Sequence, residues 1–97
     1  MARIPLQRID VLLLGTAVEI TVTFDKEDPT ATITIEDEYE NTRVDEASMT
    51  KLSSTVFQYI FQSDEDWTAC NFYATITAVK GEYTGKSQFV FEMRELS

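Results

Sequence analysis

Apolar and polar residues alternate with a period of two along most of this 97-residue chain. The segment 18–24 reads Val-Glu-Ile-Thr-Val-Thr-Phe, and segments 31–36, 72–78 and 88–94 show the same alternation. Successive side chains of a strand point to opposite faces, so this period is typical of strands with one buried and one solvated face. Residue types that favour strands fill these segments. The pattern therefore predicts an all-β chain.

Turn residues separate the alternating segments. Gly15-Thr16, the polar run 25–29 and the run from Gly81 to Gly85 each interrupt the alternation. A turn every 8–12 residues indicates an antiparallel β-sandwich of six or seven strands. We expect one domain over 1–97, in which residues 1–8 form an N-terminal arm that could reach a neighbouring subunit. The strands are expected at 6–14, 17–24, 30–37, 55–62, 69–80 and 85–95, with 44–50 as the seventh.

The alternation also predicts which side chains form the core. One face of each strand should carry the inner residues, which are Ile9, Val11, Leu13, Val18, Ile20, Val22, Phe24, Ala31, Ile33, Ile35, Phe57, Tyr59, Phe61, Cys70, Phe72, Ala74, Ile76, Ala78, Phe89, Phe91 and Met93.

The second half of the chain has a recognisable order of segments. It runs through Val44–Lys51, the aromatic strand Val56–Phe61, an acidic loop with Trp67, the strand Phe72–Ala78, the run Gly81–Gly85 and the strand Phe89–Glu92. This order resembles bacterial immunoglobulin-like modules of surface proteins and tailed phages, especially the short stand-alone immunoglobulin-like structural proteins of tailed viruses. The resemblance covers residues 15–95. It implies an immunoglobulin-like sandwich that acts through protein contacts.

Charge is unevenly distributed along the chain. The net charge is −9, from 8 basic and 17 acidic residues, and such an anion is repelled by nucleic acid. The whole imbalance lies within residues 25–66. If 44–50 forms a strand, two acidic runs should meet at one end of the sandwich. This acidic pole comprises Glu36, Asp37, Glu38, Asp64, Glu65 and Asp66.

Three readings of the acidic pole remain open. It could be a solvated surface, a docking surface for a basic partner, or a calcium site with Asp37, Asp64 and Asp66 as ligands. No Asp-x-Asp-x-Asp-Gly loop is present, and we assign no metal site.

The residue inventory gives little support for catalysis. The chain has no histidine and one cysteine, which excludes Ser/His/Asp and Cys/His arrangements and a multi-cysteine zinc site. We expect no enzyme activity and no cofactor. No apolar stretch approaches the roughly 20 residues of a membrane span, so no membrane partner is expected.

An apolar patch is the candidate contact surface. Leu12, Leu14, Val56 and Ile60 should share the outer face of one sheet, unless the first strand tucks between the sheets and buries the leucines. Trp67 could stack on a sugar, or it could pack over the end of the core.

The expected function is that of a non-enzymatic structural protein. The chain reads as a complete small protein that starts at its own Met1 without a signal peptide. We expect a component of a tailed-virus particle, in the head, neck or tail. Such a component would be assembled in the host cytoplasm and would bind other structural proteins or copies of itself in a multi-copy virion. The alternative is a module of a bacterial cell-surface protein or adhesin that binds calcium or carbohydrate.

Overall fold

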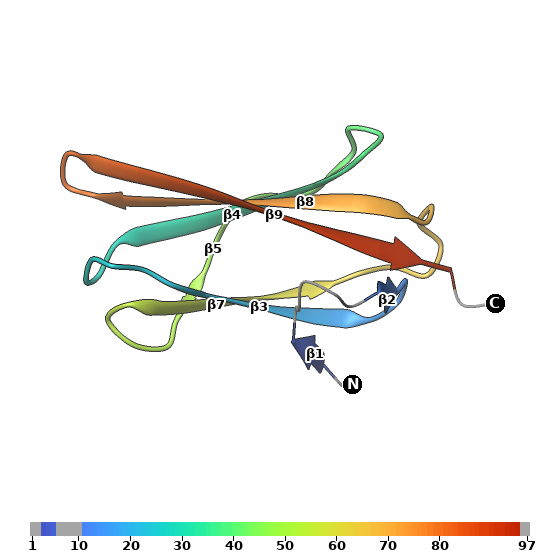
Figure 1. The fold of residues 1–97 in the computed structure, drawn as a ribbon, viewed down its shortest axis with the longest axis horizontal. Coiled ribbons are helices and arrows are strands. Elements are labelled where there is room, and N and C mark those ends of the chain that lie inside the picture. The colour runs from blue at the N-terminus through green and yellow to red at the C-terminus, as the bar shows by residue number, and fades with distance from the viewer. Residues whose placement is uncertain (1–2, 6–10, 96–97) are drawn as a thin grey trace.

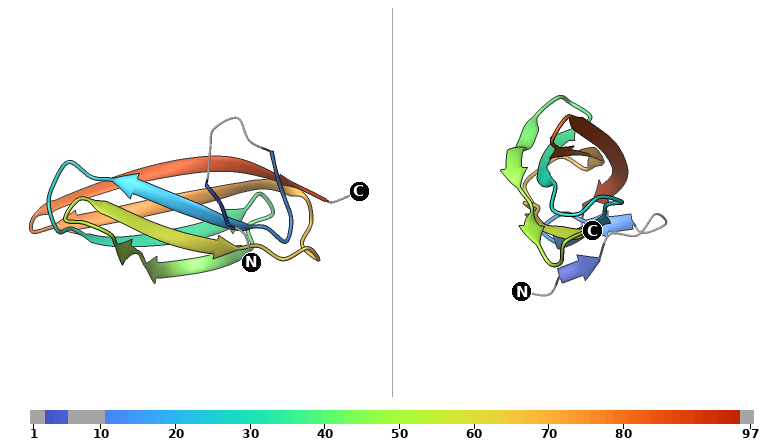
Figure 2. Two further views of the ribbon diagram at one scale, coloured as in Figure 1. Left: turned by 90° about the horizontal axis from the view of Figure 1, so that it is seen from below. Right: turned by 90° about the vertical axis from the view of Figure 1, so that its left-hand side faces the viewer.

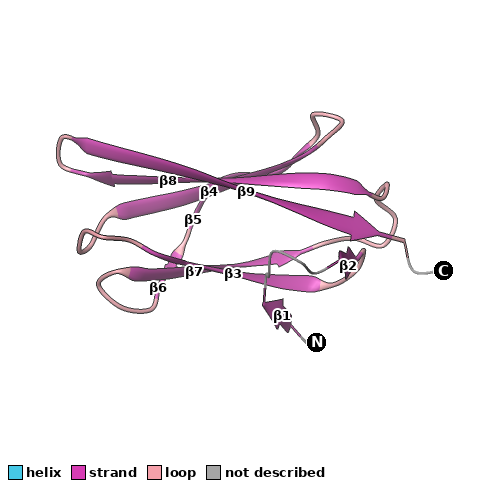
Figure 3. Cartoon of the chain, viewed as in Figure 1, coloured by secondary structure: helices cyan, strands magenta, loops and turns pink. Residues whose placement is uncertain are grey.

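The computed structural model describes residues 3–5 and 11–95 and contains strands but no helix over that range (Figure 3). The described residues accordingly include no helix with the length and hydropathy of a membrane span. The strands are β1 (Arg3–Pro5), β2 (Val11–Leu13), β3 (Ala17–Thr23), β4 (Thr30–Asp37), β5 (Thr42–Ser48), β6 (Thr50–Lys51), β7 (Val56–Gln62), β8 (Cys70–Lys80) and β9 (Tyr83–Arg94).

Two sheets face each other as a sandwich (Figure 1). One sheet has the order β1-β3-β7-β6 and the other β2-β9-β8-β4-β5. This corresponds to the immunoglobulin order, with the first strand shared between an A-B-E-D sheet and a G-F-C sheet extended by one strand. The prediction of an all-β sandwich is confirmed. The ladders are not all antiparallel, because β1 pairs with β3 and β2 pairs with β9 in parallel.

The expected strand at 44–50 exists, but it is divided between the sheets. β5 pairs with β4 in one sheet, and β6 pairs with β7 in the other. Met49 lies between the two strands and is buried, and its N–H donates to the Ala31 carbonyl. The chain therefore crosses from one sheet to the other at a residue that the alternation does not place in the core.

Most predicted core residues are buried. The buried core contains the predicted residues Val18, Ile20, Ala31, Ile33, Ile35, Phe57, Phe61, Cys70, Phe72, Ala74, Ile76, Phe91 and Met93. Four further predicted residues pack against this core while partly exposed: Val22, Phe24, Tyr59 and Phe89. Ile9 lies outside the described residues, as do Arg8 and the rest of 6–10.

The first strand corrects the prediction. Residues 6–10 of its expected range 6–14 lie outside the described residues, and β2 (Val11–Leu13) is the described part of the strand. Its inward side is reversed: Leu12 and Leu14 are 3% and 6% exposed, whereas Leu13 is 41% exposed. The cause is the register with β9, which pairs Leu12 with Met93, an inward-facing and fully buried residue. Paired residues of neighbouring strands face the same side of a sheet, so Leu12 enters the core.

The turn between β2 and β3 depends on Gly15. Its φ of 95° is a conformation that residues with a Cβ rarely adopt. Its N–H donates to the Oγ of buried Ser63 at 2.9 Å, and that hydroxyl donates to the Thr16 carbonyl at 2.7 Å. Ser63 thus joins this turn to the start of the β7–β8 loop.

Gly15→Ala is expected to lower the free energy of unfolding by about 1–2 kcal/mol, because the alanine Cβ strains the backbone at this φ. Urea denaturation measures the change. Gly85→Ala is the matched control: Gly85 has no positive φ and a Cβ there meets nothing within 4 Å, so little change is expected. Equal effects of the two substitutions would contradict the role of Gly15.

Candidate interaction surfaces

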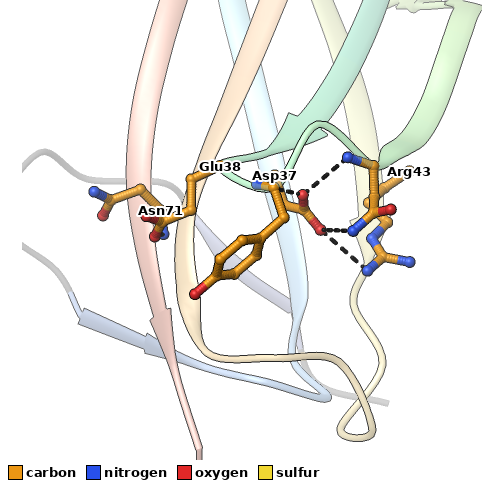
Figure 4. A network of polar contacts seen from close by, with 6 residues as sticks. Asp37, Glu38, Arg43 and Asn71 are labelled. Carbon is orange, nitrogen blue, oxygen red and sulfur yellow. Dashed lines mark hydrogen bonds and ion pairs between the residues drawn. The ribbon is translucent and has the colours of Figure 1, made fainter.

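Asp37, at the end of β4, organises the β4–β5 loop (Figure 4). It is 4% exposed. Its Oδ1 accepts hydrogen bonds from the N–H groups of Tyr39 and Asn41 at 2.9 and 3.0 Å. Its Oδ2 accepts from Asn41 Nδ2 at 3.1 Å and from Arg43 Nη2 at 3.0 Å. Both carboxylate oxygens are therefore fully engaged within the loop.

The protonation of Asp37 reflects two opposing effects. Burial disfavours the charged form and by itself raises the pKa of the carboxyl. The hydrogen bonds from Asn41, Tyr39 and Arg43 outweigh burial, and the pKa lies below its ordinary value. Asp37 is thus an ionised structural group that is buried at the acidic pole and does not contribute to its exposed surface.

Arg43 connects this network to the end of the core. Its guanidinium lies over the ring of Trp67, 4.4 Å from Cζ to the ring centroid. Trp67 stacks on Phe61 and Phe72, with centroids 5.8 and 6.0 Å apart. Trp67 therefore packs over the end of the core, which is one of the two roles predicted for it. The other role was stacking on a sugar, but the ring already contacts Arg43, Phe61 and Phe72.

The two acidic runs meet at the same end of the sandwich. The Glu38 N–H donates to the Asn71 carbonyl, and Glu38 Oε1 accepts from the Asn71 N–H at 2.8 Å. This contact places the first run beside the start of β8, directly after the loop that carries Asp64, Glu65 and Asp66. In that loop Asp64 Oδ1 accepts from the Asp66 N–H at 2.8 Å, which closes a local turn. The five remaining carboxylates are exposed: Glu36, Glu38, Asp64, Glu65 and Asp66.

Millimolar calcium is expected to leave the thermal midpoint unchanged. Asp37 is one of the three ligands in the calcium hypothesis, and a cation would have to displace the hydrogen bonds that it accepts. Over 3–5 and 11–95, no group of three or more His, Cys, Asp or Glu side chains is arranged to hold a metal ion. Thermal unfolding with calcium and with a chelator measures the effect. A saturable rise in the midpoint would contradict this expectation.

The predicted apolar patch does not form as a four-residue surface. Leu12 and Leu14 lie in the core, as described above, which leaves Val56 and Ile60. These two are half-buried on the outer face of β7, opposite Thr23 and Glu19 of β3. What remains is two aliphatic side chains among polar neighbours, as is ordinary on protein surfaces.

Cys70 is buried, as the alternation predicts. Burial raises the pKa of its thiol, which keeps the side chain protonated and weakly nucleophilic. Its environment is that of a small apolar core residue.

On one side of the sandwich, two strand edges have no partner along most of their length within residues 3–5 and 11–95. β1 pairs only with residues 17–19 of β3, and β2 pairs only with residues 92–94 of β9. No strand within the described residues pairs with the outer edge of β3 over 20–23 or of β9 over 83–91. Figure 2 shows β1 and β2 beside only the end of the molecule nearer the termini. We call this region, formed by 20–24 and 83–91, the open side.

Burial along the strands changes toward the open side. Inward-facing Phe91 and Met93 of β9 are buried, but inward-facing Phe89 is only half-buried. Val22 and Phe24, at the corresponding end of β3, are half-buried too. The apolar core is therefore covered by Leu12 and Leu14 at one end and remains partly accessible at the other.

The strand edges on the opposite side of the sandwich are poorly suited to pair with a further strand. The edge strand β5 has two register irregularities against β4, carries Asp45 and Glu46, and has Glu46 at a φ of 45°. The other edge, β6, has two residues. Irregular, charged or very short edge strands resist pairing with another chain, so the long edge of β9 is the more available one.

The comparisons with known proteins add no relative. No family model matches this chain, and neither a curated protein nor a solved structure is significantly similar to it.

Proposed function

We propose that this protein is a non-enzymatic interaction module that docks another protein along its open side. The observation that supports this proposal is the pair of edges on β3 and β9 that no strand of the described part of the chain covers, next to the half-buried side chains of Val22, Phe24 and Phe89. Unpaired edge strands provide a row of backbone donors and acceptors that another chain can use. Burial of the adjacent apolar side chains would add to the binding free energy.

The proposed setting is a tailed-virus particle, in which the protein is a structural component of the head, neck or tail. It would assemble in the host cytoplasm and would bind other structural proteins or copies of itself. The support is the order of segments over residues 15–95, which resembles stand-alone immunoglobulin-like proteins of tailed viruses, together with the general immunoglobulin strand order of the sandwich.

Particle composition and hydrogen exchange test this proposal together. Quantitative mass spectrometry of purified particles of the virus that encodes this chain is expected to find the chain in multiple copies per particle. Exchange of the amides over 83–91 is expected to be slower in the particle than in the free protein, whereas those of β5 should be unchanged. Absence from purified particles would overturn the viral setting, and unchanged exchange over 83–91 would overturn docking at the open side. A gene encoding a long tandem-repeat surface protein around this chain would favour the bacterial cell-surface alternative.

A further inference from the structure

A cavity of about 510 Å³ lies between the sheets at the open side, at the end with the β8–β9 hairpin. Thr23 and Phe24 line it from the β3 end, and Ile76 and Ala78 line it from β8. The sequence of β9 explains the empty space. Its inward positions carry Phe91 and Phe89 and then change to the small Ser87 and Gly85, which pair with Ile76 and Ala78.

The cavity has an apolar floor and a charged rim. Phe24, Ile76 and Ala78 provide apolar surface, while the charged lining residues are three lysines and one aspartate: Lys26, Lys80, Lys86 and Asp25. The Lys26 ammonium also lies 4.9 Å from the ring centroid of exposed Tyr83. Lys26 and Lys80 also line an adjoining hollow with Glu27, Asp28 and Glu82, so positive charge is in excess only at Lys86, on the edge strand β9. This positive charge favours a ligand that carries negative charge next to an apolar group.

The flanking edges favour a peptide as that ligand. Residues 83–91 of β9 extend beside the cavity, and the outer edge of this segment has no strand partner within 3–5 and 11–95. An extended segment that pairs with this edge directs alternate side chains to one face, where one of them can enter the cavity.

A second copy of β9 is disfavoured as the occupant. Lys86 lies within the free edge, and antiparallel pairing of two β9 edges about a two-fold axis there would bring two like charges together. Lysine on an edge strand is a common device against self-pairing. The same charge attracts an acidic strand.

We propose that the open side accepts an extended acidic segment of a partner protein, which adds as a strand to β9 and inserts one apolar side chain into the cavity. When its apolar side chain enters the cavity, the alternating carboxylates of the segment lie on the outer face of the sheet, beside Lys86, which pairs with outward-facing Thr77. This inference rests on the proposed docking function and specifies the chemistry of the partner.

Peptide titrations followed by NMR of the isotope-labelled protein test the inference. The probe is a nine-residue peptide in which valine alternates with glutamate. Two controls are a peptide of the same composition without alternation and a peptide of valine alternating with lysine. We expect saturable shifts of the amides over 83–91 with the first peptide alone, and weaker binding as salt is raised.

Two variants localise the effect. Lys86→Glu is expected to weaken binding of the acidic peptide about tenfold, whereas Arg94→Glu, at the other end of the same strand, should leave it within about twofold. Ser87→Phe should fill the cavity and abolish binding. Ser87→Phe changes the packing and could prevent folding. If the Ser87→Phe protein does not fold, the binding measured for Lys86→Glu decides whether the proposal holds.

Each other result has a distinct meaning. Equal binding of the acidic and basic alternating peptides would overturn the acidic partner while leaving docking at the open side intact. No shift over 83–91 with any peptide would overturn both. A dimer of the free protein with these amides protected would identify a second copy as the occupant and overturn the proposal.

Discussion

Replacing Leu12 and Leu14 with serine is expected to unfold the protein rather than to dissociate an assembly. Both side chains belong to the core cluster. Removal of one buried leucine side chain costs about 2–5 kcal/mol, and a domain of this size has a total stability of about 5–15 kcal/mol. Serine also brings a hydroxyl into an apolar site. A combined loss of about 5 kcal/mol or more is expected, measured by urea denaturation.

Leu13→Ser is the matched control for this experiment. The residue lies between the two leucines in β2 and is 41% exposed, so a change of less than about 1 kcal/mol is expected. A folded Leu12→Ser/Leu14→Ser variant with an unchanged denaturation midpoint and an altered oligomeric state would contradict the core position of these leucines.

Asp37→Ala is expected to destabilise the protein by about 3 kcal/mol, because it leaves the Arg43 guanidinium and two loop N–H groups without their acceptor. Asp37→Asn keeps the shape and one acceptor oxygen but loses the charge, so an intermediate loss is expected. Asp64→Ala removes an exposed carboxylate that accepts one N–H and should cost less than about 1 kcal/mol. Chemical denaturation at pH 7 measures all three. Equal effects of Asp37→Ala and Asp64→Ala would contradict the structural role of Asp37.

The lowered pKa of Asp37 also predicts a pH dependence of stability. A carboxyl whose pKa is depressed by folding stabilises the protein above its unfolded-state pKa, and this contribution is lost as the pH falls through the folded pKa. The free energy of unfolding should therefore decrease below about pH 4, and Asp37→Asn should flatten that decrease. Asp28 is a solvent-exposed control for this pH dependence. The main cause of its lowered pKa is the hydrogen bond that it accepts from Lys51. Because solvent screens that pair, Asp28→Asn should change the pH profile less.

Local alternation was sufficient to predict the central strands. The expected ranges 17–24, 30–37, 55–62 and 69–80 each agree with the structure within one residue at either end. The first strand was not predictable in this way. Apolar residues occupy both parities at 11–14, and the register with Met93 decides which of them are buried. Only the tertiary partner contains that information.

The site residues show the same limit. A run of acidic residues in a sequence indicates a solvated surface. Nothing in the sequence shows that the Asp37 side chain turns inward. Asn41 and Arg43, which follow it at intervals of four and six residues, are a weak signal for a loop closed around a carboxylate. The open side had a clearer signal, because small residues replace large ones at the inward positions of 85–91. That signal has meaning only once the neighbouring edge is known to lack a strand.

The fluorescence of Trp67 reports on only one end of the sandwich. It is the single tryptophan of the chain, and its indole lies between Arg43 and the rings of Phe61 and Phe72, at the end of the sandwich opposite the β8–β9 hairpin. Its emission should shift to longer wavelength when the Asp37 network opens and water reaches the ring. Binding at the distant hairpin end should leave the emission unchanged. One spectrum can therefore separate a ligand that occupies the open side from a substitution that loosens the other end.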